Sequence, residues 1–61
     1  MNHYAEWRYL MTLTEDEDEL LYMLDHGFTQ EQVADMRGIT RQAISKQLKK
    51  ITRKAKKEGL E

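Results

Sequence analysis

The chain has 61 residues and no cysteine, which limits it to one small domain and excludes disulfides and thiolate zinc sites; nor do its two histidines stand at a metal-ligand spacing. No apolar run approaches the roughly 20 residues that a membrane span needs, and the start lacks the apolar run of a signal peptide, so we expect a cytoplasmic protein. The net charge of −1 hides an asymmetry: residues 1–36 carry nine acids and one base, whereas residues 37–61 carry nine bases and two acids, which favours polyanion binding by the second half.

Apolar residues at helical spacing predict two helices in the acidic half. Tyr4, Trp7 and Met11 indicate a short first helix from Tyr4 to about Met11. The second helix follows Thr14, which forms a capping box with Glu17, and it ends at Gly27. Its apolar face is formed by Leu20, Leu21 and Leu24, and we expect Phe28 to pack back onto it.

The basic half predicts a short helix, a tight turn and a long helix. Thr29 and Gln32 form a second capping box, which starts a helix from Gln30 to Arg37. Gly38 suits the left-handed turn, and Thr40 caps a last helix that we expect to run from Arg41 to about Glu58. The apolar stripe of this helix steps by four, three and four residues, through Ile44, Leu48, Ile51 and Ala55.

No alternating β-branched run predicts a strand, so we expect an all-α fold: a small three- to four-helix bundle that contains a helix-turn-helix. The predicted organisation is a single domain over residues 1–61. Residues 1–12 form an N-terminal helix or arm, and residues 14–58 form the helix-turn-helix core with its long basic last helix.

The segment from Gln30 to Lys49 meets the packing demands of a DNA-binding helix-turn-helix. Ala34 is small where the two helices approach, and Val33 completes the apolar wedge between them. Ile39, after the turn glycine, can point into the core. This segment resembles the helix-turn-helix superfamily, and most closely the promoter-reading region 4 of primary sigma factors and related small regulators. The resemblance rests on Thr29, Glu31, Val33, Gly38, Ile39, Thr40, Arg41 and Ile44.

One residue departs from the family pattern. Arg37 stands before the turn glycine, where such proteins usually have leucine. Either the aliphatic stem of Arg37 is buried while its charged head reaches solvent, or Met36 turns inward in its place.

The outward face of the last helix is the predicted DNA-binding surface, because no acid occurs between Arg37 and Lys57. The resemblance implies that the start of this helix enters the major groove, where arginine can bond guanine and glutamine can bond adenine. The predicted base-reading residues are Arg41, Gln42, Ser45 and Lys46. Side chains better placed for phosphates are those of Thr29, Thr40, Lys49, Lys50 and Arg53.

The expected partner is double-stranded DNA, without a cofactor or a metal, and the expected role is sequence-specific transcriptional regulation. A homodimer on a palindrome would raise the modest affinity of so small a module. It could use the patch of Tyr4, Trp7 and Met11, or the stripe of Ile51, Ala55 and Leu60, unless both only cover the monomer core.

The alternative function is a small protein-interaction module that binds RNA polymerase or another protein through the acids from Glu15 to Glu19. RNA binding is less favoured, because the aromatic residues lie outside the basic helix and cannot stack bases there. We do not expect an enzyme, since one serine and two separated histidines form no nucleophile and base pair.

Overall fold

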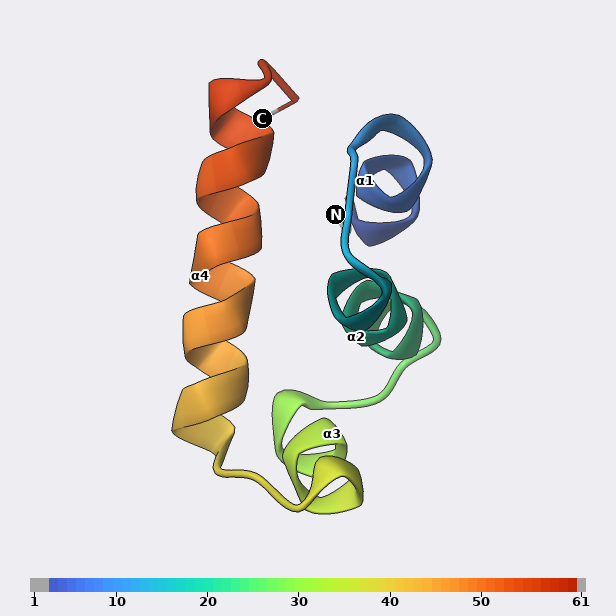
Figure 1. The fold of residues 1–61 in the computed structure, drawn as a ribbon. Coiled ribbons are helices and arrows are strands. Elements are labelled where there is room, and N and C mark those ends of the chain that lie inside the picture. Colours follow the sequence, from blue (N-terminus) through green and yellow to red (C-terminus); the bar gives the residue numbers. More distant parts are fainter. Residues whose placement is uncertain (1–2, 61) are drawn as a thin grey trace.

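The computed structural model describes residues 3–60, and within this range the protein is built from four α-helices and no strand, which confirms the predicted all-α class (Figure 1). The first and last residues of the predicted domain, 1, 2 and 61, lie outside the described range. The helices are α1 (Tyr4–Leu10), α2 (Glu15–Asp25), α3 (Gln30–Arg37) and α4 (Arg41–Lys57). Each predicted helix is present, with its ends within two residues of the expected positions.

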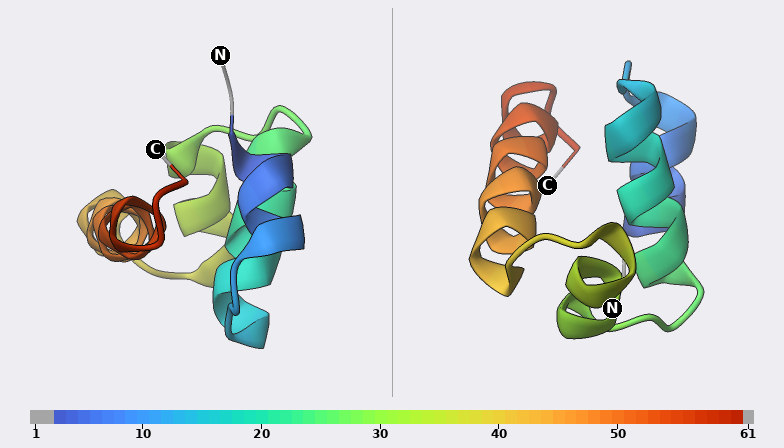
Figure 2. Two further views of the ribbon diagram at one scale, coloured as in Figure 1. Left: turned by 90° about the horizontal axis from the view of Figure 1, so that it is seen from above. Right: turned by 60° about the horizontal axis from the view of Figure 1, so that its bottom comes forward.

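The long helix α4 forms one side of the molecule, and the three shorter helices are stacked along the other (Figure 1). Figure 2 shows the same division from above and from below, with α3 at one end between α2 and the start of α4. Within the part of the chain that the structure describes, this arrangement leaves one long face of α4 without a neighbouring helix. No helix in the described residues is both long and apolar enough to cross a membrane.

Threonine caps set the starts of three helices. The Thr14 hydroxyl oxygen accepts the Glu17 N–H, and the Glu17 carboxylate accepts the Thr14 N–H, so the predicted capping box is complete. Thr29 and Gln32 form the same reciprocal pair at α3. Thr40 caps α4 by accepting the Ala43 N–H at 3.1 Å. Each cap satisfies backbone donors that a helix end leaves unpaired, which fixes where the helix begins.

The core lies where α4 meets the other three helices. Its buried residues come from all four helices and the α1–α2 connection: Trp7, Met11, Leu20, Leu21, Leu24, Val33, Ala34, Ile44, Ile51 and Ala55. Leu48 is only partly buried, although the periodicity places it on the same stripe as Ile44 and Ile51. Tyr4 and Leu60 are also partly buried against this cluster.

Both predicted dimer surfaces are therefore used inside one chain. Trp7 and Met11 fill the core beside α2, and Ile51 and Ala55 are fully buried on the inner face of α4. The alternative that these side chains cover the monomer core therefore holds for Trp7, Met11, Ile51 and Ala55, whereas Tyr4 and Leu60 keep part of their surface exposed. A homodimer stays a prediction that needs another surface.

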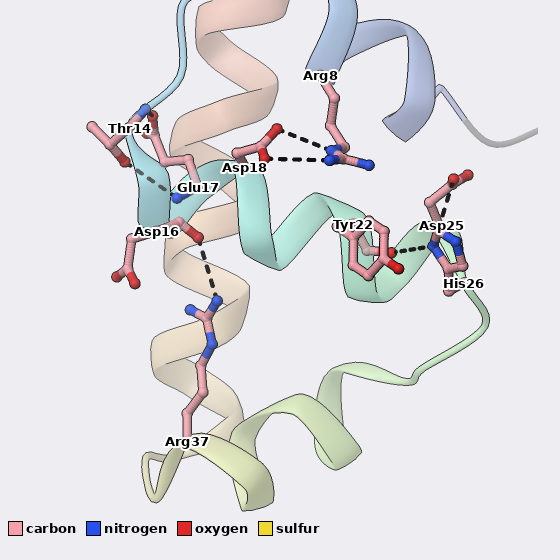
Figure 3. A network of polar contacts seen from close by, with 9 residues as sticks. All are labelled: Arg8, Thr14, Asp16, Glu17, Asp18, Tyr22, Asp25, His26 and Arg37. Atoms are coloured by element: carbon pink, nitrogen blue, oxygen red, sulfur yellow. Dashed lines mark hydrogen bonds and ion pairs between the residues drawn. The ribbon is translucent and has the colours of Figure 1, made fainter.

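The first of the two alternatives for Arg37 is confirmed. The Arg37 side chain is only 15% exposed, and its Nη2 donates to the Asp16 carbonyl oxygen and to Glu19 Oε1, at 3.3 and 3.2 Å (Figure 3 draws the contact with Asp16). Met36 remains 62% exposed and does not turn inward. The arginine stem thus fills the space expected for leucine while its head ties α3 to α2.

Two apolar residues near the turns lie outside the core. Ile39 is 39% exposed, so the prediction that it points into the core is wrong. The left-handed Gly38 (φ 68°) brings the Ile39 N–H to the Ala34 carbonyl oxygen at 3.0 Å, and the Ile39 side chain is left at the rim. Phe28 is equally exposed and is not part of the buried cluster, although its N–H donates to the Met23 carbonyl oxygen of α2 at 3.1 Å; the packing of its side chain onto α2 stays a prediction.

Candidate nucleic-acid interface

Helices α3 and α4 are joined by a turn of three residues, Gly38 to Thr40, which sets the start of α4 beside α3. Gly38 ends α3 in the left-handed conformation, and Thr40 caps α4 immediately afterwards. Val33 and Ala34 of α3 pack with Ile44 of α4 in the core. The hairpin therefore has the short helix, glycine turn and second helix that a DNA-binding helix-turn-helix requires.

A row of polar side chains follows the face of α4 that points away from the other helices. We call Gln42, Lys46, Lys49 and Arg53 the outer face of α4; they recur at steps of four, three and four residues, and all four are exposed. In the described residues none of their three cations pairs with a carboxylate. Their charges are thus available to an external anion.

Two shallow hollows adjoin the outer face. The first is lined by Thr40, Gln42, Ser45, Lys46 and Lys49, and it covers the first turns of α4. The second continues along the helix and is lined by Ser45, Leu48, Lys49, Thr52 and Arg53. Ser45 is half-buried between them, so its hydroxyl is less accessible than the neighbouring charged groups.

Arg41 lies on a different side of α4 from the outer face. It shares a hollow with Thr29, Gln30 and Glu31, at the first turn of α3. The starts of the two helices are therefore neighbours, and the structure brings predicted residues Arg41 and Thr29 together. Gln30 and Glu31 lie at the same place but were not among the predicted DNA-contacting residues; the Thr29 capping box, which sets the first turn of α3, was the signal that could have indicated them.

Lys50 and Lys54 face the acidic start of α2. Lys50 shares a hollow with Thr14, Asp16, Glu17 and Gln47. Lys54 Nζ donates to Glu17 Oε1 at 3.1 Å and to the Thr12 carbonyl oxygen at 3.2 Å. We call the side of α4 that carries Lys50 and Lys54 the inner flank of α4. The predicted phosphate-binding residues are thus divided, with Lys49 and Arg53 on the outer face and Lys50 on the inner flank.

The electrostatics of the inner flank favour ionised Glu17. The hydrogen bond from the Thr14 backbone N–H lowers the pKa of the Glu17 carboxyl, and the Lys54 ammonium lowers it further against the opposing effect of burial. Glu17 therefore holds two elements at once, the first turn of α2 and the second half of α4.

A second polar contact fixes α1 on α2. The Arg8 guanidinium forms two hydrogen bonds with the Asp18 carboxylate, at 2.9 and 3.3 Å (Figure 3), and this pairing raises the pKa of Arg8. The contact lies on α2 and is separate from the outer face of α4.

Comparisons with known proteins give no relative: no family model, no curated protein and no solved structure matches the chain. Nor do the described residues contain a group of three or more histidine, aspartate or glutamate side chains that could hold a metal ion.

Proposed function

We propose that the protein binds double-stranded DNA as a sequence-specific transcriptional regulator of the helix-turn-helix type, inserting the start of α4 into the major groove. The observation that carries the proposal is the outer face of α4: its three cations are exposed and pair with no carboxylate of the described residues, while the opposite, apolar side of α4 is buried. A DNA duplex is the anion that such a long cationic face fits, because its phosphates are repeated along two strands.

The four predicted base-reading residues occupy different positions on α4, and their expected contributions differ accordingly. Gln42 and Lys46 stand on the exposed first turns of α4, where a recognition helix meets base edges. Arg41 stands closer to α3 and would approach the groove together with the first turn of α3, where Thr29 lies. Ser45 is the weakest of the four candidates, since it is half-buried.

The phosphate contacts are expected mainly on one side of α4. Lys49 and Arg53 pair with no carboxylate in residues 3–60. The Thr29 and Thr40 hydroxyls can still donate to a phosphate oxygen while they accept from the helix backbone. Lys50 stands beside Asp16 and Glu17, whose carboxylates would repel a phosphate there. We infer that Lys50 contributes less to DNA affinity than Lys49.

The test begins with selection of bound sequences from a pool of random duplexes, followed by titration of the preferred site at several salt concentrations. Arg41→Ala should cost about 1–3 kcal/mol on the preferred site and relax the choice at one base pair. Arg53→Ala serves as the matched control, because it should weaken preferred and random duplexes alike.

Two results would contradict the proposal, one against DNA binding and one against base reading by Arg41. Absence of salt-dependent binding to any duplex would contradict DNA binding and leave the protein-interaction alternative. Equal losses of affinity for Arg41→Ala and Arg53→Ala on every sequence would contradict only the base-reading role of Arg41 and would leave DNA binding itself intact.

A further inference from the structure

A shallow apolar hollow lies between α2 and α3. It is lined by Tyr22 and Met23 of α2 and by Met36 of α3, with Glu19 and Arg37 at its edge, and it has a volume of about 400 Å³. Tyr22 is 46% exposed and Met36 is 62% exposed, so two large apolar side chains face solvent around one depression. Such a combination is typical of surfaces that bind another protein.

Tyr22 is held in place by its neighbours. The Arg8 guanidinium carbon lies 4.8 Å from the centre of the Tyr22 ring, and the His26 ring centre lies 4.1 Å from it. Arg8 is itself fixed by its two hydrogen bonds to Asp18 (Figure 3). A pre-positioned aromatic side chain loses little conformational entropy on binding, which makes Tyr22 a suitable anchor.

Met36 supplies the opposite property. It is long and flexible, and its thioether adapts to partners of different shape. The hollow thus combines a rigid aromatic edge from α2 with an adaptable edge from α3.

The charge around the hollow is negative. Two cations of the described residues adjoin it, and both are paired: Arg37 is mostly covered and bonds Glu19, and Arg8, over the Tyr22 ring, bonds Asp18. The Glu19 side chain is 64% exposed. Glu15 is exposed one turn earlier on the same helix. These carboxylates disfavour nucleic acid and anionic lipid at this place and favour a cationic partner.

We propose that the hollow between α2 and α3 binds a cationic amphipathic helix of another protein. One or two apolar side chains of that helix would lie between Tyr22 and Met36, and its lysines or arginines would face Glu15 and Glu19. A second copy of this chain cannot supply such a helix from α4, because Ile44, Ile51 and Ala55 are fully buried in its own core.

This surface is separate from the proposed DNA interface. In Figure 3 Tyr22 lies in front of α2, and Arg37 rises from the end of α3 in front of α4, whereas the outer face of α4 points away from the other helices. The proposal does not depend on DNA binding, and both surfaces could be occupied together.

The experiment uses the full chain labelled with ¹⁵N and a synthetic alanine-based helical peptide of about five turns, with a leucine stripe flanked by lysines. We expect amide shift changes concentrated at Tyr22, Met23 and Met36, and a saturable titration. The same peptide with glutamates in place of the lysines should bind at least about tenfold more weakly.

Matched variants distinguish peptide binding in the hollow from nonspecific binding elsewhere on the surface. Met36→Ser and the double change of Glu15→Gln with Glu19→Gln should each weaken the cationic peptide. Tyr9→Ala removes a more exposed aromatic residue on α1, and Glu58→Gln removes an exposed acid after α4, so neither should matter. A thermal unfolding curve for each variant shows that its fold is kept.

Three outcomes would overturn the proposal. The first is a glutamate peptide that binds as tightly as the lysine peptide, and the second is a set of shift changes that avoids the hollow or is absent altogether. The third is a set of shift changes at Tyr22 and Met36 that depends on protein concentration without peptide, which would identify a second copy as the occupant.

Discussion

Lys49 and Lys54 have the same side chain and lie on the same helix, yet their surroundings differ completely. Lys54 is bound to Glu17 and to the Thr12 carbonyl oxygen, so its charge holds α4 against the start of α2. Lys49 is exposed between two hollows and meets no carboxylate in the described residues. The basic helix α4 thus contains two kinds of cation: those paired within the protein and those available to a partner.

The difference arises because α4 has neighbours on only one side. Its inner flank faces the acids that cluster at the start of α2, where they also stabilise the positive end of that helix. The same acids therefore neutralise one flank of α4 and leave the outer face cationic.

The largest effect is expected for the buried side of α4, which holds both kinds of cation in place. Ile51 is fully buried, and Ile51→Ala should lower the free energy of unfolding by about 2–5 kcal/mol, which threatens the whole fold of so small a domain. Chemical denaturation followed by the fluorescence of Trp7, the single tryptophan, measures it. Lys49→Ala on the opposite side of the helix should leave the unfolding curve nearly unchanged; a comparable loss there would contradict the division into outer and inner sides.

An intermediate effect is expected when the outer face and the inner flank are compared by DNA affinity. Lys49→Ala should reduce the slope of log affinity against log salt concentration by about 1, because one phosphate contact is lost. Lys50→Ala, a change of the same charge one residue later, should alter the slope less, since Asp16 and Glu17 lie beside it. Binding isotherms at several salt concentrations measure both slopes, and equal slopes would show that the acids do not shield Lys50.

The smallest effect is expected for the ion pair on the inner flank. The lowered pKa of Glu17 means that its ionised form stabilises the fold above the ordinary carboxyl pKa of 4.5, and that this contribution is lost as the pH falls through the lowered value. Lys54→Ala should therefore lower the free energy of unfolding by no more than about 1 kcal/mol at pH 7, and by less near pH 3. Lys49→Ala is the control at both pH values, and a Lys54→Ala effect that is independent of pH would contradict the pairing with Glu17.

Much of this fold could be predicted from local patterns. The threonine caps and the two capping boxes fix the helix starts through hydrogen bonds between residues three positions apart, and such contacts are visible in the sequence. The apolar spacing along α4 likewise predicted its buried side, because side chains three or four positions apart lie on one face of a helix. Exposure at the turns was harder to predict, and Phe28 and Ile39 lie outside the buried cluster because the exposure of a turn residue depends on how distant helices pack.

The candidate site was only partly predictable. Spacing along α4 places Gln42, Lys46, Lys49 and Arg53 on one face, whatever surrounds the helix. The position of Arg41 beside Thr29 and Gln30 depends on the turn angle between α3 and α4. The apolar hollow between α2 and α3 depends on the packing of two helices joined by a loop, which no local pattern specifies.

The amino-acid sequence by itself determined where the helices begin, which sides of them are apolar, and that the charges divide between the two halves of the chain. Only the tertiary structure decided which cations meet those acids and which remain free, and whether Arg37 could replace a leucine. The reason is physical: helix starts and helix faces depend on residues within a few positions, whereas the partner of a charge depends on which helices pack side by side.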